Sequence, residues 1–214
     1  MYRAHSFLLK LEDLLERGTR LCQLRNFLSV DERKWLEAKM NDSFANYYAH
    51  RRKYSAALQY SLRATKVYMH FGDLRNVAIS ELHTSYILSR LRRGESALKS
   101  LQKVLHFAND GLLDSNSKDC RRGDQIIIVA VAYHNIAVQQ VIAEKIRQAC
   151  VSSQNGRRLI KMCLNYGNSY IAQFESTHRI CLDRLMRIAH YKKRCGADEK
   201  LELLFESIVR DLYD

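Results

Sequence analysis

No proline interrupts the 214 residues of this chain, and only eight glycines are spread along it. Sheets and hairpins need such residues at their tight turns, whereas long helices joined by short polar turns do not. The stretch with the highest strand propensity, residues 125–131, lies inside a longer helical period of apolar residues. The sequence therefore predicts an all-α protein of about nine helices without a sheet.

End signals divide the chain into these helices. Ser29 and Glu32 have the spacing of a capping box, which predicts a helix from Val30 to about Arg52. Asp73 can cap a helix that ends at Gly94, and Asp124 can cap an apolar helix that runs to Glu144. Residues 109–125 are the only long polar break and are expected to form a loop. Further helices are expected at about 5–24, 55–70, 95–109, 146–165, 167–193 and 197–213.

The composition is that of a folded globular protein, with 47% hydrophobic and 27% charged residues. The net charge of +12 favours anionic partners. It is unevenly distributed, because residues 51–103 carry eleven Lys or Arg against three Asp or Glu, whereas residues 198–214 carry two against six. A solvated surface with cations at helix C-termini is the alternative explanation.

The six cysteines show no CxxC pair, which predicts reduced core residues in an intracellular, cytoplasmic protein. Residues 1–18 have acidic residues within their apolar run, so we expect no secretory signal there. The longest apolar run, residues 126–133, is too short to span a bilayer, and we expect no membrane insertion.

A basic turn followed by a small residue occurs three times along the chain. Ala57, Ala97 and Ala149 each follow such a turn, at spacings of 40 and 52 residues. Another small or medium residue stands seven positions after each and a small one twelve positions before each. These flanking residues are Ala64, Val104 and Gly156, and Ala45, Ser85 and Ala137. Small residues at this spacing allow two helices to pack closely, so each copy predicts a helical hairpin.

This pattern, together with the large residues Tyr48 and Leu88, resembles the tetratricopeptide repeat over roughly residues 38–165. The 40-residue spacing is closer to longer-helix variants such as the kinesin light chains, which would place the protein with the cytoskeleton. The chain departs from the family at Asn41 and Glu81, where a Trp is usual, and it lacks the proline that ends each repeat. A generic helical bundle is the alternative.

The resemblance implies a right-handed α-solenoid of antiparallel hairpins forming one domain, residues 1–214. Residues 1–28 would form a capping helix, residues 29–165 about three hairpins with loop 109–125 inserted, and residues 166–214 a long helix and an acidic cap.

If the helices stack in this way, the first helix of each pair lines a concave groove. The groove candidates are Asn46, His50, His83, Tyr86, Arg90, His134 and Asn135. Asn135 matches a position where such repeats often carry an asparagine that binds a partner's backbone, although a local packing hydrogen bond explains it equally well. Tyr86 can instead be a core residue.

The hairpin turns carry more cations than helix capping requires. Equivalent turns of a solenoid stack along one edge, which predicts a basic ridge. Its residues are Arg51, Arg52, Lys53, Arg92, Arg93, Lys145 and Arg147. An acidic or extended segment of a protein partner suits such a surface, and the acidic helix 198–214 is a candidate for docking there in the same or a neighbouring molecule.

The sequence contains no phosphate-binding glycine loop, no nucleophile elbow and no metal-binding Cys/His spacing. We therefore expect no cofactor and no catalysis. Glu175, His178 and Asp183 are the only acid/base-like group and are interpreted as a surface ion network, and the histidines as surface or groove residues. A protein-binding scaffold is the leading interpretation. RNA binding is the alternative, since the basic charge permits it but no base-reading pattern is visible.

Overall fold

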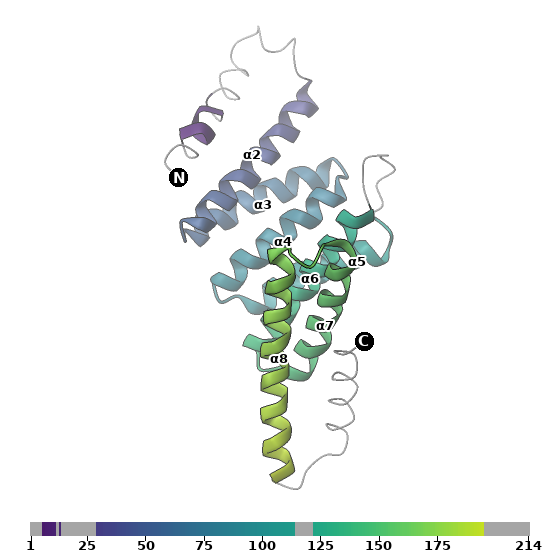
Figure 1. Ribbon diagram of the computed structural model, residues 1–214. Coiled ribbons are helices and arrows are strands. Elements are labelled where there is room, and N and C mark those ends of the chain that lie inside the picture. Colours follow the sequence, from purple (N-terminus) through teal and green to yellow (C-terminus); the bar gives the residue numbers. More distant parts are fainter. Residues whose placement is uncertain (1–5, 12, 14–28, 114–121, 195–214) are drawn as a thin grey trace. The chain divides into compact units, whose positions relative to one another are not determined.

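A computed structural model describes residues 6–11, 13, 29–113 and 122–194 (Figure 1). These residues form helices and short connections without a strand, so the predicted all-α class is confirmed for the described part of the chain. Residues 6–11 are helical, and the predicted helix 197–213 lies outside the described residues. The longer helices are α2 (Val30–His50), α3 (Tyr54–His70), α4 (Leu74–Arg90), α5 (Gly94–Asn109), α6 (Arg122–Ile142), α7 (Ile146–Cys163) and α8 (Ser169–Arg194).

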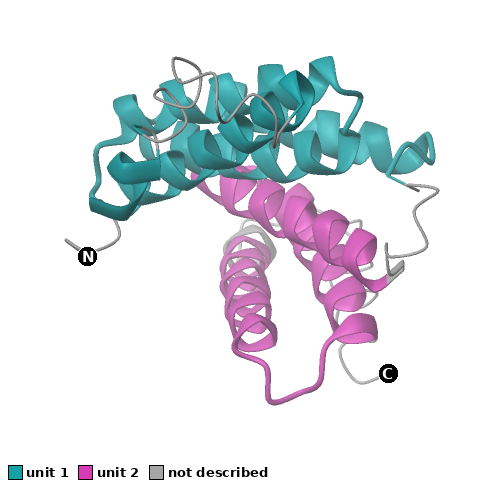
Figure 2. Cartoon of the chain, turned by 90° about the horizontal axis from the view of Figure 1, so that it is seen from above, with its two compact units in different colours: residues 1–120 teal, residues 121–214 magenta. Residues whose placement is uncertain are grey.

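The chain divides into two compact units, residues 1–120 and residues 121–214 (Figure 2). In unit 1, α3 packs against both α2 and α4, α5 packs against α4, and α2 also touches α4. In unit 2, α7 packs against both α6 and α8, and α6 also touches α8. Packing between sequential neighbours is consistent with the predicted helical hairpins. The organisation into one domain stays a prediction.

The predicted small residues all lie where two helices meet. Ala57, Ala97 and Ala149, each near the start of the second helix of a pair, have no exposed surface. The corresponding residues on the first helices, Ala45, Ser85 and Ala137, are also buried, as are Ala64 and Val104. Gly156 of α7 lies so close to α6 that an added Cβ would stand 3.1 Å from the Ala130 carbonyl oxygen and 3.2 Å from the His134 nitrogen. Small side chains therefore determine how closely the paired helices approach.

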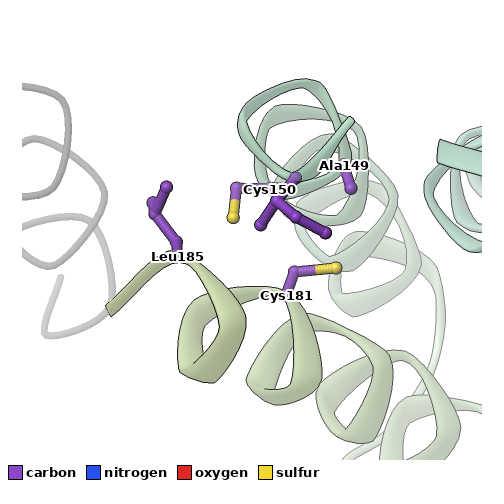
Figure 3. Packing of buried hydrophobic residues seen from close by; sticks show 5 residues of the cluster. Ala149, Cys150, Cys181 and Leu185 are labelled. Carbon is purple, nitrogen blue, oxygen red and sulfur yellow. The ribbon is translucent and has the colours of Figure 1, made fainter. Parts of the chain in front are cut away.

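Each unit has its own apolar core. In unit 2, Cys150 of α7 lies with Cys181 and Leu185 of α8 in one buried cluster (Figure 3). Burial raises the pKa of the Cys150 thiol to about 12 and also raises that of Cys181. Both cysteines and the half-buried Cys163 form no disulfide, whereas Cys22, Cys120 and Cys195 lie outside the described residues. Cys150 and Cys181 therefore serve as small apolar residues.

The helix ends agree only in part with the predicted signals. The capping box of α2 is confirmed, because the Ser29 amide donates to Glu32 at 2.7 Å and the Glu32 amide donates to the Ser29 hydroxyl at 3.1 Å. Asp73 caps α4 through the Asn76 amide, also as predicted.

Two predicted helix ends are wrong. Asp124 does not cap α6, because that helix already begins at Arg122 and Asp124 lies in its first turn, where its charge still complements the helix dipole. Residues 122–125 of the predicted loop are therefore helical. Gly94 does not end a helix either, because α4 ends at Arg90 and Gly94 is the first residue of α5.

Within the described residues, one stretch of α6, Gly123–Ile142, is long and apolar enough to cross a membrane by length and composition. Core helices of soluble proteins pass the same test. This stretch packs against α7 and α8 and carries the buried polar residues His134 and Gln139.

The close contact at Gly156 makes a prediction about stability. We expect Gly156→Ala to lower the unfolding free energy, because the α6 backbone must move to admit the methyl group, and this cost exceeds the roughly 1 kcal/mol that alanine gains over glycine in a helix. Gly123→Ala is the matched control, because nothing lies within 4 Å of its added Cβ, and it should stabilise the protein. Urea denaturation of both variants checks this. Equal stabilisation by the two substitutions would show that α6 and α7 are not closely packed.

Candidate partner-binding surface

Five connections that follow helices share one backbone geometry. Each has one residue with φ between 59° and 67°, in the left-handed region, namely Arg52, Gly72, Arg92, Gly111 and Glu144. The amide of the next residue donates back to a carbonyl of the helix's last turn, as in Lys53 to Tyr48 and Arg93 to Leu88, both at 2.9 Å. This is the Schellman arrangement, which satisfies carbonyls at a helix C-terminus.

Whether the residue with positive φ is a glycine depends on where its turn lies. Gly72 and Gly111 follow the second helix of a hairpin, and glycine adopts this conformation without steric cost. Arg52, Arg92 and Glu144 stand in the turn inside a hairpin, where a side chain costs about 1–2 kcal/mol relative to a right-handed conformation. Arginine therefore occupies two positions at which glycine would be less strained.

These two arginine-bearing turns lie at the same end of unit 1. Since α2 and α4 each run antiparallel to α3, their C-terminal ends point in the same direction. Ala49, Ala57 and Ile87 form one buried cluster there, with Leu91 packed against it. The two turns thus flank a common core. The exposed cations of this region, which we name the basic end, are Arg51, Arg52, Lys53, Arg90, Arg92 and Arg93.

The third part of the predicted ridge belongs to unit 2 and has a different charge. Lys145 and Arg147 are both exposed. However, Glu144 takes the left-handed position that Arg52 and Arg92 hold in unit 1. One acidic residue therefore offsets one of the two cations, and the basic character is stronger in unit 1.

The groove candidates of unit 1 lie on adjacent helices. Asp42 of α2 stands 3.9 Å from His83 of α4. Asn46 and Tyr86 each follow one turn later on these two helices. Asn46, His50 and Arg90 are exposed and His83 is half-buried.

Tyr86 is 46% exposed, so it is a surface residue rather than part of the core. Its hydroxyl accepts a hydrogen bond from Arg90 Nε at 3.3 Å, and the guanidinium lies 5.5 Å from the ring centroid. The pair thus holds one cation of the basic end over an aromatic side chain.

An open pocket of about 610 Å³ adjoins the same face of α2. It is lined by Phe7, Leu8, Leu11, Ser43, Asn46, Tyr47 and His50. Two groove candidates, Asn46 and His50, thus share a concave site with the N-terminal helical residues. The apolar spacing of residues 7–11 is visible in the sequence, but the α2 surface they face is not.

The groove candidates of unit 2 require a correction. His134 is only 7% exposed, and its ring stacks on Phe174 of α8 with 4.3 Å between centroids. Burial lowers the pKa of His134 to about 4, so the ring is neutral at pH 7. The repeat-like pattern ends at about residue 165 and does not include α8. Because α8 covers His134 of α6, this histidine is a core residue and not a groove residue. Asn135 beside it is half-buried.

The acid/base-like group of α8 consists of an ion network and a buried histidine. Glu175 accepts hydrogen bonds from Arg157 at 2.7 Å and Lys161 at 2.6 Å. Burial raises the pKa of Glu175, but these two cations outweigh it and lower the pKa below its usual value. His178 was predicted at the surface but is 1% exposed, with its Nδ1 2.8 Å from the Ser153 hydroxyl. Among the described residues, no group of three or more His, Cys, Asp or Glu side chains could hold a metal ion.

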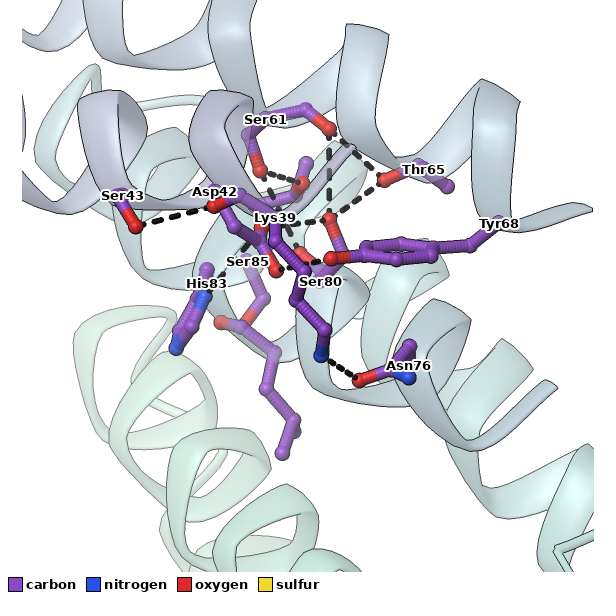
Figure 4. A network of polar contacts seen from close by, with 12 residues as sticks. Lys39, Asp42, Ser43, Ser61, Thr65, Tyr68, Asn76, Ser80, His83 and Ser85 are labelled. Atoms are coloured by element: carbon purple, nitrogen blue, oxygen red, sulfur yellow. Dashed lines mark hydrogen bonds and ion pairs between the residues drawn. The ribbon is translucent and has the colours of Figure 1, made fainter. Parts of the chain in front are cut away.

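A polar network that the sequence analysis missed joins α2, α3 and α4 (Figure 4). Asp42 accepts from Ser80 at 3.3 Å and from the Tyr68 hydroxyl at 3.4 Å. Burial and the Asp42 carboxylate raise the pKa of Tyr68, so its hydroxyl remains a donor. Further contacts join Ser61 to Thr84 at 2.7 Å, Thr65 to Ser80 at 2.8 Å and Lys39 to Asn76 at 2.6 Å. The hydroxyl residues on the inner faces of α3 and α4 are the signal that could have revealed it.

Comparison with known proteins finds no family model that matches the chain and no curated protein that matches it. The resemblance to tetratricopeptide repeats therefore stays a prediction.

The Asp42 network predicts a specific loss of stability. We expect Asp42→Ala to lower the unfolding free energy by about 1–3 kcal/mol, because it leaves the Tyr68 and Ser80 hydroxyls without this acceptor in a buried region. Ser43→Ala is the control, since Ser43 is exposed and its hydroxyl donates to the Lys39 carbonyl of its own helix. Chemical denaturation measures both. In a Tyr68→Phe background, Asp42→Ala should lower the unfolding free energy by less. If the effects of the two substitutions were fully additive, the hydrogen bond between Asp42 and Tyr68 would be excluded.

The two buried histidines predict acid sensitivity of unit 2. The pKa of His178 is lowered to about 4 by burial and by Arg157 and Lys161, against the opposing effect of Glu175. Unfolded histidine titrates near 6.5, so the unfolded state binds more protons below that pH. Stability should be fully present above pH 6.5 and fall as the pH drops towards 4, by up to roughly 3 kcal/mol per histidine.

Denaturation midpoints measured between pH 7.5 and pH 4.5 check this expectation. His134→Leu should reduce the slope of unfolding free energy against pH by about one proton, because the unfolded state then has one histidine fewer to protonate. A slope that does not respond to His134→Leu would mean that His134 is not buried as a neutral ring.

Proposed function

We propose that this chain is a non-catalytic helical-repeat adaptor that binds a segment of a protein partner through unit 1. In this proposal the hairpins form a right-handed α-solenoid of the tetratricopeptide kind. The basic end attracts the partner, and the neighbouring faces of α2 and α4 hold it.

The observation that carries the proposal is the left-handed conformation of Arg52 and Arg92. Strained backbone positions concentrate at functional sites, because the strain is tolerated where the side chain is needed. Both residues are exposed, so burial does not account for an arginine at either position. Their presence in matching turns supports a shared role in binding.

The number of cations supports the same conclusion. A cation near a helix C-terminus contributes about 0.3–1 kcal/mol through the helix dipole, which explains one or two per turn. Arg51, Arg52 and Lys53 exceed that requirement in a single turn. Clustered cations raise association rates with acidic partners, and the effect falls with ionic strength. An acidic or extended protein segment is therefore the proposed ligand.

RNA binding is the second candidate, since the same six cations would attract phosphates. It predicts a steep salt dependence that is indifferent to the sequence of the nucleic acid. Titration with a generic RNA at two salt concentrations separates it from peptide binding, for which RNA should bind weakly at physiological salt.

Arg52→Gly combined with Arg92→Gly tests the proposal. Because glycine relieves the left-handed strain, the unfolding free energy should stay unchanged or rise by up to about 1 kcal/mol per site. The same variant should lose proteins that the wild-type chain retains in affinity purification from its native cell. Loss of binding without loss of stability points to a recognition role.

Glu144→Gly is the matched control, because it relieves the same backbone strain at the equivalent turn of unit 2. It should retain every partner of the wild type. An unchanged partner profile for the double arginine variant would overturn the proposed role of the basic end.

A further inference from the structure

We infer that the pocket beside α2 and the basic end of unit 1 form one binding site, which takes an acidic peptide segment carrying large apolar side chains. This inference rests on the proposed function and specifies the chemistry of the ligand. It also makes the N-terminal helical residues 6–11 part of the recognition surface rather than only a cap.

The walls of the pocket are incompletely covered apolar side chains. Phe7 is 78% exposed and Leu11 is 44% exposed, and both line the pocket together with Leu8. Exposed apolar surface gains about 25 cal/mol for each Å² that a ligand removes from water. The chemistry of these walls therefore favours an aliphatic or aromatic side chain as the occupant.

The opposite side of the pocket provides polar groups from α2. Ser43, Asn46 and His50 line it at successive turns of the helix, over a length of about 10 Å. The Asn46 amide can donate and accept at once, which suits the alternating donors and acceptors of a peptide backbone. Both the length and the volume accommodate more than one side chain of a chain-like ligand.

Charge determines what lies next to the apolar segment. His50, at one end of the pocket, is the last residue of α2, and Arg51, Arg52 and Lys53 follow it directly. All three are exposed cations. A peptide whose apolar side chains occupy the pocket would extend its neighbouring residues over this turn, where carboxylates are favoured and ammonium groups are repelled.

Residues 198–214 of this chain provide a probe with that chemistry. Their sequence, DEKLELLFESIVRDLYD, combines six acidic residues with Leu201, Leu204 and Phe205. A labelled peptide of this sequence tests the site directly. A second peptide with Leu201→Ser, Leu204→Ser and Phe205→Ser keeps the charge and removes these three large apolar side chains.

The experiment is a fluorescence-anisotropy titration of both peptides with the 214-residue chain. We expect the first peptide to bind at least about tenfold more tightly than the serine-substituted one. Ser43→Trp, which fills the pocket from an exposed position, should abolish that difference. Asn46→Phe is a second filling variant, and circular dichroism establishes that each is folded.

Two matched controls separate the site from general effects. Gln59→Trp adds the same bulk at an exposed position of α3 and should leave both affinities unchanged. Arg51→Glu with Arg52→Glu should weaken both peptides by about tenfold or more, whereas Lys66→Glu on the exposed face of α3 should have little effect.

Equal affinity for the two peptides, no binding of either, or binding that the filled pocket does not weaken would overturn the inference. If partner capture in the affinity purification still depended on Arg52 and Arg92, the proposed function would hold without a role for the pocket. The inference would also be overturned if an RNA of equal charge displaced the first peptide and the protein showed no preference for the peptide with apolar side chains. The surface would then be purely electrostatic.

Discussion

Close approach between paired helices is the constraint on which the rest of this structure depends. Two α-helices can come near each other only where the side chains between them are small. Ala57, Ala97 and Ala149 supply that space at the start of three second helices, and none has exposed surface. At Gly156 even a methyl group would meet the backbone of α6. The pairing of helices therefore depends on a few small residues, and larger apolar side chains fill the cores around them.

Close pairing leaves little room for the connection, and the turns inside the hairpins all use the same Schellman geometry. The chain reverses with one left-handed residue, and its neighbours satisfy the helix carbonyls. In unit 1 this places arginines on the surface at the ends of α2 and α4, beside a shared apolar cluster. The requirement for a tight turn and the display of positive charge thus have a common structural origin.

The face between α2 and α4 is supported from within by hydrogen bonds. Asp42, Tyr68 and Ser80 link α2 to α3 and α4, and Lys39 adds a bond to Asn76 near the other end. Such a network fixes the register of the helices, because a shift of one turn would leave buried hydroxyls without partners. A preorganised surface loses less entropy on binding than a mobile one, which suits a protein that acts by holding a partner.

Features determined by local interactions could be predicted from the sequence. The absence of proline, the capping box at Ser29 and the spacing of small residues determined the helices, most of their ends and their pairing, because propensity, capping and periodicity act over a few residues. The basic turns could be located for the same reason. Tertiary structure alone decided which surfaces remain exposed. His134 and His178 are buried because α8 packs on α6 and α7, a contact between segments separated along the chain. Residues 6–11 and α2 line one pocket only because the fold brings them together.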